Sequence, residues 1–262
     1  MFKHPFQIIL QILFLVGVVV FQSCKKNETI TPDIPVVAEG SLQLLATFPL
    51  QVTEPSGLSF GPDNQTLLTV SDNTNQVFEM SLSGEILNTW AYEGNDLEGV
   101  TYNKYNRTIA ITEERDRNVI ILDYDTDLIL SETHVDVHVG SENSGLEGIA
   151  FNPNNHLYYV LNESSPGEII LWSPQEGIIS ETELGFAEDY SGIYIEEESA
   201  LMWIVSDQSE HVYACDYKGN PLTKYSLGNT KFEGVVVDHA SQTLFLVNDA
   251  SAKLSVYQIL NN

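Results

Sequence analysis

The chain consists of short apolar runs separated by turn residues. Such runs recur about every 8 to 12 residues, as at 157–161 and 169–172, and groups of Asn, Pro and Gly such as 152–155 lie between them. None of the runs has the three-to-four-residue periodicity of an amphipathic helix. The pattern therefore predicts an all-β, antiparallel fold.

A five-residue phrase with glycine at its third position recurs five times. Its glycines lie 42 to 49 residues apart, at Gly57, Gly99, Gly148, Gly192 and Gly234. This spacing is the period of a four-stranded propeller blade. In the third repeat, for example, we expect strands at 148–151, 157–161, 169–172 and 178–183.

The strand count predicts the number of blades and the way the ring closes. The first four repeats each supply four strands, whereas the fifth ends after its third, at 254–259. Segment 42–48, before the first repeat, resembles the fourth strand at 222–227. If this N-terminal strand completes the last blade, residues 41–262 form a five-bladed β-propeller of four-stranded antiparallel blades. The pairing also removes the open strand edges at the two chain ends.

Residues 1–23 have the features of a lipoprotein signal peptide. A basic start at Lys3 is followed by an apolar run at 8–21, shorter than a membrane span, and then by Ser23 and Cys24. We expect Cys24 to be the lipidated first residue of a membrane-anchored cell-envelope protein, on the periplasmic side or the cell surface. An uncleaved anchor helix is the alternative. Residues 24–40 lack apolar periodicity and predict a flexible tether.

Composition restricts the partners of the chain. Its formal net charge of −26 disfavours nucleic acid and anionic lipid, which carry the same sign, and favours cations. Membrane contact is therefore expected only through the lipid anchor, on a monomeric protein. With Cys24 assigned to lipid, Cys215 has no partner for a disulfide and is expected to be a buried strand thiol.

Carboxylates recur at two positions of the repeat. Glu98, Glu147 and Glu233 directly precede the glycine, where the first and fourth repeats have Ser56 and Ser191. A second set lies 14 or 15 residues after the glycine, at Asp72, Glu113, Glu163, Asp207 and Asp249. In a propeller the first strand of a blade begins where the second strand ends. Both sets should therefore converge at one mouth of the central channel.

Converging carboxylates stay ionised only with a counter-charge, and no lysine or arginine occupies an equivalent position in the repeats. Ca²⁺ would supply this charge because it accepts six to eight oxygen ligands in irregular geometry. The sequence therefore predicts a calcium site formed by Glu98, Glu147 and Glu233, with the second set as secondary candidates. For the second set the sequence favours turn capping, and for the three glutamates the alternative is that they are solvated rim charges.

Several of these features together resemble one known family. The Glu-Gly phrase before an apolar strand, the segment 157–163 (LYYVLNE) and the lipoprotein leader are similar to the SdiA-regulated (YjiK-like) family of bacterial envelope proteins, over about residues 41–260. The resemblance implies a five-bladed propeller with bound calcium, distantly related to NHL-repeat propellers and without an established biochemical role. It extends to individual ligands only where the phrase itself matches, at Glu98, Glu147 and Glu233.

For function, the sequence favours a non-catalytic protein that binds an unidentified protein or small molecule at the channel mouth. The alternative is a calcium-dependent lactonase or esterase, in which the metal polarises a carbonyl and a base activates water. His211 is the histidine expected nearest the mouth, and Glu163 or Asp207 are the other candidate bases. A third hypothesis is a protein-docking platform without metal.

Overall fold

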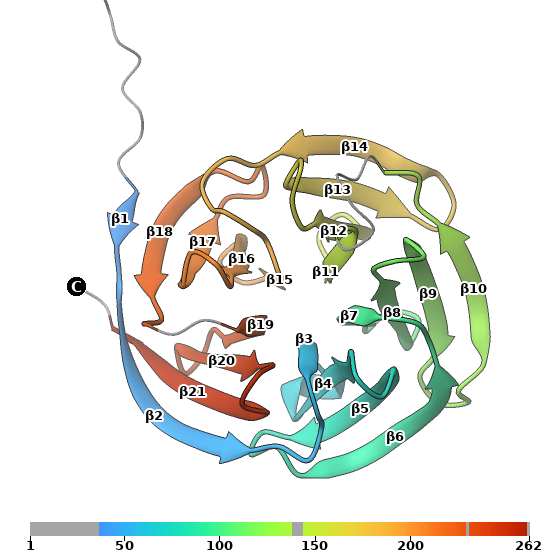
Figure 1. Ribbon diagram of the computed structural model, residues 1–262, viewed down its shortest axis with the longest axis horizontal. Coiled ribbons are helices and arrows are strands. Elements are labelled where there is room, and N and C mark those ends of the chain that lie inside the picture. The colour runs from blue at the N-terminus through green and yellow to red at the C-terminus, as the bar shows by residue number, and fades with distance from the viewer. Residues whose placement is uncertain (1–36, 138–143, 229–230, 261–262) are drawn as a thin grey trace, which may run out of the picture. The chain divides into compact units, whose positions relative to one another are not determined.

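The computed structural model describes residues 37–137, 144–228 and 231–260, which form a ring of five β-sheets (Figure 1). Each sheet contains four antiparallel strands that follow one another from the centre of the ring to its rim, and one sheet has a fifth, short strand at its outer edge. The predicted all-β, five-bladed propeller is thereby confirmed. The expected lipidation site, Cys24, lies outside the described residues, as do the expected signal peptide and most of the tether.

The first three blades are each formed by one continuous segment. Blade one contains β3 (Pro55–Phe60), β4 (Thr66–Ser71), β5 (Gln76–Ser81) and β6 (Ile86–Glu93), with the 3-10 turn η1 (Pro62–Asn64) between β3 and β4. Blade two contains β7 (Leu97–Asn103), β8 (Thr108–Glu113), β9 (Asn118–Asp123) and β10 (Ile129–His134). Blade three contains β11 (Leu146–Asn152), β12 (Leu157–Asn162), β13 (Glu168–Ser173) and β14 (Gly177–Glu183). No helix in the described ranges is long and apolar enough to cross a membrane.

The last two blades both involve the N-terminal segment. Blade four contains β15 (Gly192–Glu196), β16 (Leu201–Ser206), β17 (His211–Cys215) and β18 (Pro221–Ser226). Blade five contains β19 (Phe232–Asp238), β20 (Thr243–Asn248) and β21 (Lys253–Leu260), and β2 (Ser41–Pro49) completes it by pairing antiparallel with β21. This is the closure that the strand count predicts. One pairing was not predicted: β1 (Ala38–Glu39), at the end of the expected tether, adds in parallel to the outer edge of β18.

The five repeated glycines lie where the inner strands of neighbouring blades approach most closely. A Cβ atom placed on any of them would fall within 2.8 Å of backbone atoms in the next blade. For Gly99 the obstacle is the carbonyl oxygen of Glu147, and for Gly57, whose φ is also +59°, it is that of Glu98. Real Cβ atoms essentially never lie under 3.0 Å from such atoms. Glycine therefore recurs because the ring closes around these positions.

Most of the hydrophobic core lies between blades rather than in one central mass. Trp172 of blade three packs with Val119 and Ile121 of blade two, and Trp90 of blade one packs against the second blade in the same way. Each sheet thus buries its faces against its two neighbours, as expected for sheets whose strands read as continuous apolar runs. This packing fixes the inner ends of the strands, which carry the repeated polar residues.

Candidate metal centre

A cavity of about 260 Å³ lies around the starts of the inner strands, on one face of the ring. Three repeat positions line it. The position directly before the glycine contributes Ser56, Glu98, Glu147, Ser191 and Glu233. The fifteenth position after the glycine contributes Asp72, Glu114, Glu163, Asp207 and Asp249, and the third position before it contributes Glu54, Asp96, Asp189 and Lys231. The cavity is thus strongly acidic.

In four blades a local irregularity of the inner strand occurs at the residue before the glycine, which lines this cavity. In blades one, two, three and five the pairing of the first two strands shifts register at the phrase, for example between Leu97 and Gly99. Such a bulge leaves one residue outside the ladder and redirects its side chain. Blade four has no shift at Gly192. There Ser191, the residue before the glycine, lines the cavity without a bulge.

A backbone hydrogen bond holds the carboxylate at the end of the second strand in four blades. The amide of the fifteenth residue after the glycine donates to the carbonyl of the third residue before it. These bonds are Asp72 to Glu54 (3.2 Å), Glu114 to Asp96 (2.9 Å), Glu163 to Gly145 (3.1 Å) and Asp249 to Lys231 (2.9 Å). In blade four the Asp189 carboxylate instead accepts a hydrogen bond from the Gln208 amide at 3.0 Å. The repeated bond explains why residues so distant in sequence share one mouth.

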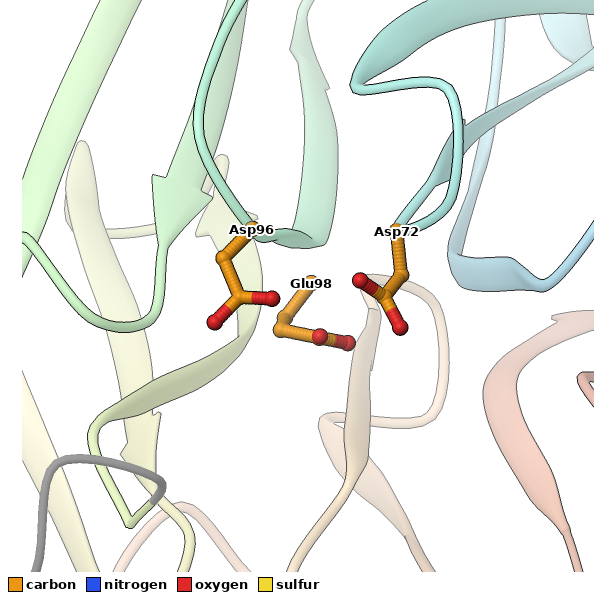
Figure 2. A group of neighbouring side chains, drawn as sticks. All are labelled: Asp72, Asp96 and Glu98. Atoms are coloured by element: carbon orange, nitrogen blue, oxygen red, sulfur yellow. The ribbon is translucent and has the colours of Figure 1, made fainter.

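Two groups of carboxylates meet closely within the cavity. Ligand oxygens of Asp72, Asp96 and Glu98 all lie within 4.8 Å of one another, and so do those of Glu114, Glu147 and Glu163. Each group joins two adjacent blades. Figure 2 shows the first group, with the carboxylates of Asp72 and Glu98 facing each other and Asp96 beside Glu98.

Two basic side chains also reach the cavity, which corrects the expectation that none would supply counter-charge. Lys231 Nζ lies 2.9 Å from Asp207 Oδ2 and 3.9 Å from Glu233 Oε1. Arg115 Nε lies 2.9 Å from Asp96 Oδ2, without hydrogen-bond geometry. Neither Lys231 nor Arg115 occupies one of the two repeat positions from which the site was predicted. Two cations against this many carboxylates leave most of the negative charge uncompensated.

Burial raises the pKa of the carboxyl groups in the cavity, and neighbouring carboxylates add to the effect. The pKa rises to about 6 for Asp72, to about 7 for Glu114 and to about 7 for Glu233. Burial also places the pKa of Glu98 and Glu147 well above the ordinary value. Loss of solvation favours the neutral acid, and an adjacent negative charge does the same. A bound cation would reverse both effects.

The structure brings most of the predicted residues together, but with a different geometry. Glu98, Glu147 and Glu233 all line the cavity, yet they do not form one three-carboxylate group. Glu98 and Glu147 belong to separate groups. Glu233 instead lies near the ammonium group of Lys231, which is closer to Asp207. Among the described residues, the closest carboxylates therefore gather in two groups on neighbouring blade pairs rather than between the three glutamates.

Glu113 is the one predicted calcium ligand that does not line the cavity. Its carboxylate accepts hydrogen bonds from the Tyr92 hydroxyl (2.7 Å), the Asn95 amide (3.0 Å) and the Asn118 side-chain amide (3.0 Å). Glu114 takes its place. The sequence held the signal for this correction, because Glu114 lies 15 residues after Gly99, the same offset as in the other four repeats.

Sequence inspection also missed the third position before the glycine. Its residues differ in type between blades, including acidic, glycine and basic examples, so no single letter marks the position. The constant offset of three residues was the available signal. Three of these residues, Glu54, Asp96 and Lys231, have positive φ, which marks the tight turn into the inner strand.

Fold and site together define a five-bladed propeller with a carboxylate-rich cavity at one end of its channel. The profile of the SdiA-regulated family matches residues 47–249, and the chain belongs to that family. Among solved structures, it is similar to the crystal structure of glutaminyl cyclase from Myxococcus xanthus. The TM-score is 0.69 at 11% identity, over 86% of this chain and 100% of that one, and this likeness concerns the fold alone. No curated protein matched the sequence.

Proposed function

We propose that the protein is a lipid-anchored cell-envelope propeller whose acidic cavity binds Ca²⁺ and presents a binding surface to an unidentified protein or small molecule. The observation that carries this proposal is the excess of carboxylates over basic groups in one small cavity. The donor set fits the ion, because it offers hard oxygen ligands, whereas cysteine and histidine are absent from the described lining. A buried oxygen of Asp249 also has no hydrogen-bond partner among the described residues.

The group of Glu114, Glu147 and Glu163 is the proposed centre of cation binding. Glu147 is buried, with 8% of the residue exposed, and its carboxylate makes no hydrogen bond with the described residues. The Glu114 carboxylate accepts a 3.3 Å hydrogen bond from the Gly145 amide. No basic side chain forms an ion pair with this group in the described structure, whereas Arg115 contacts Asp96 in the other group. When bound, the ion supplies positive charge that links blades two and three.

Calcium binding is tested by elemental analysis of the purified full chain and by its melting curve with and without chelator. We expect bound calcium and a lower melting temperature after chelation. Glu147→Gln should abolish both effects, and Glu181→Gln, on the exposed outer strand of the same blade, should preserve them. Absence of calcium together with an unchanged melting curve would refute the proposal.

The membrane anchor is tested separately. Cys24→Ala should release the protein from the membrane fraction without changing its calcium content, because the cavity is built entirely from the propeller. Continued membrane association of this variant would contradict lipidation at Cys24.

A calcium-dependent hydrolase of lactonase or esterase type is the second candidate function. It is favoured by Asp207, a candidate base that lines the cavity but lies outside the proposed cation-binding group. His211 does not line the cavity, and its Nδ1 contacts the Ser209 carbonyl instead. A panel of lactones and aryl esters should show calcium-dependent turnover that Glu114→Gln abolishes. Without such turnover the non-catalytic role stands.

A further inference from the structure

A second and larger cavity, of about 400 Å³, lies at the opposite ends of the inner strands. Residues after the repeated glycines and the turns that follow line it, whereas residues before the glycines line the acidic cavity. The two cavities share no lining residue, and the close-packed glycines lie between them along the strands. This second cavity is therefore independent of the proposed calcium centre.

Aromatic side chains form much of the wall of this cavity. Phe60, Tyr102, Phe151 and Tyr194 come from four different blades. Contacts between rings hold them in place. The ring centroids of Phe60 and Tyr194 lie 5.9 Å apart in an edge-on contact, and those of Tyr102 and Tyr124, a ring outside the wall, lie 5.2 Å apart. A preformed wall avoids the entropic cost of ordering side chains on binding. The volume falls within the usual range for small-molecule sites.

The rim of this cavity is charged, with an excess of carboxylates. Asp63, Glu197 and Glu198 line it together with a single basic residue, Lys104. Lys104 Nζ pairs with Glu197 at 2.5 Å and so connects blade two with blade four. Asp63 and Glu198 are exposed and form no ion pair with another described residue. Their two negative charges are therefore available to a ligand.

We propose that this cavity binds a small organic ammonium ion, with the apolar body of the ligand against the aromatic wall and the ammonium group near Asp63 and Glu198. Aromatic rings attract cations through the negative faces of their π systems, and the rim carboxylates add direct charge attraction. The Tyr194 hydroxyl, which makes no hydrogen bond within the described ranges, is a further acceptor in the wall. An anionic ligand would meet the repulsion of the same carboxylates.

The test compares two probes that share an apolar body, phenethylammonium and phenethyl alcohol, by calorimetric titration of the full chain. The ammonium should bind saturably and about tenfold more tightly than the alcohol, because only the ammonium gains from the carboxylates and the ring faces. Methylammonium, which lacks the apolar body, should bind at least about tenfold more weakly than phenethylammonium. Chelator should leave these affinities unchanged, which separates the result from the outcome for calcium.

Substitutions then locate the site. Asp63→Asn combined with Glu198→Gln should weaken phenethylammonium about fivefold and leave the alcohol unaffected, since two exposed charges contribute modestly. Both residues are exposed, so the variant should fold normally. Glu181→Gln controls for general attraction to an acidic chain and should have no effect. Equal binding of the two main probes, no binding of either, or equal behaviour of the double variant and Glu181→Gln would each overturn the proposal.

Discussion

The buried carboxylates should make the stability of the calcium-free protein fall as pH rises. Glu233 shows the size of the effect, because its side chain is only 14% exposed and its pKa rises from 4.5 to about 7 on folding. Between these values the folded chain holds a proton that the unfolded chain has released. The free energy of unfolding therefore decreases with increasing pH across this window. At 1.36 kcal/mol per pKa unit, Glu233 alone accounts for a loss of about 2.5 kcal/mol between pH 5 and pH 8.

The pKa values of Glu98 and Glu147 shift in the same direction and enlarge the loss. For a domain of this size, 2.5 kcal/mol corresponds to a decrease of roughly 5 to 10 °C in melting temperature. Calcium should oppose the decrease, because it stabilises the ionised carboxylates that the folded state otherwise disfavours. At a calcium concentration of 100 times Kd, binding adds about 2.7 kcal/mol.

The assay is thermal unfolding followed by circular dichroism from pH 5 to pH 8, in chelator and in excess calcium. We expect the melting temperature in chelator to fall with pH and the stabilisation by calcium to be largest at pH 8. Glu147→Gln should reduce both dependences, and Glu181→Gln should reproduce the parent chain. A melting temperature in chelator that stays constant or rises from pH 5 to pH 8 would refute the electrostatic reasoning.

Three further predictions concern the repeats and the thiol. Gly99→Ala should lower the free energy of unfolding by about 2 to 4 kcal/mol, because its Cβ meets backbone of the next blade. Gly185→Ala is the control in the same denaturant titration, because a Cβ atom at Gly185 would have no neighbouring atom within 4 Å. An equal loss of stability in the two variants would contradict this account. Glu114→Gln should weaken calcium binding in calorimetry, while Glu113→Gln should reduce stability and leave calcium affinity intact. Weaker calcium binding by Glu113→Gln, with unchanged affinity in Glu114→Gln, would instead support Glu113 as the ligand. Burial raises the pKa of Cys215 to about 12, so a thiol reagent should modify it only in denaturant, and rapid labelling of the native protein would disprove its burial.

The fold could be predicted almost completely from sequence because its determinants are periodic. The glycine spacing reflects a geometric requirement that every blade shares, namely the close approach of inner strands. The closing strand at 41–49 could be found because the last repeat lacks one strand. The parallel addition of Ala38–Glu39 to β18 could not, since two residues carry no recognisable strand pattern.

The site was predictable only to the level of which face carries the carboxylates. Which carboxylates meet depends on the bulges at the phrase and on the turns before it, and neither has a sequence signature of its own. The choice of Glu113 over Glu114 shows the difficulty, because adjacent residues of a strand end point in opposite directions. Lys231 was missed because its position carries an acidic residue, glycine or lysine depending on the blade.

The pairing of β2 with β21 determines when the ring can be completed. During synthesis from the N-terminus, residues 41–49 emerge long before their partner at 253–260 exists. The first four blades can form from contacts that are local in sequence, but the fifth requires the two most distant strands of the ring to meet. Until then, one edge of β2 and one edge of the growing ring remain open to other chains. An interruption of synthesis before the last strand would leave a nearly complete but aggregation-prone protein.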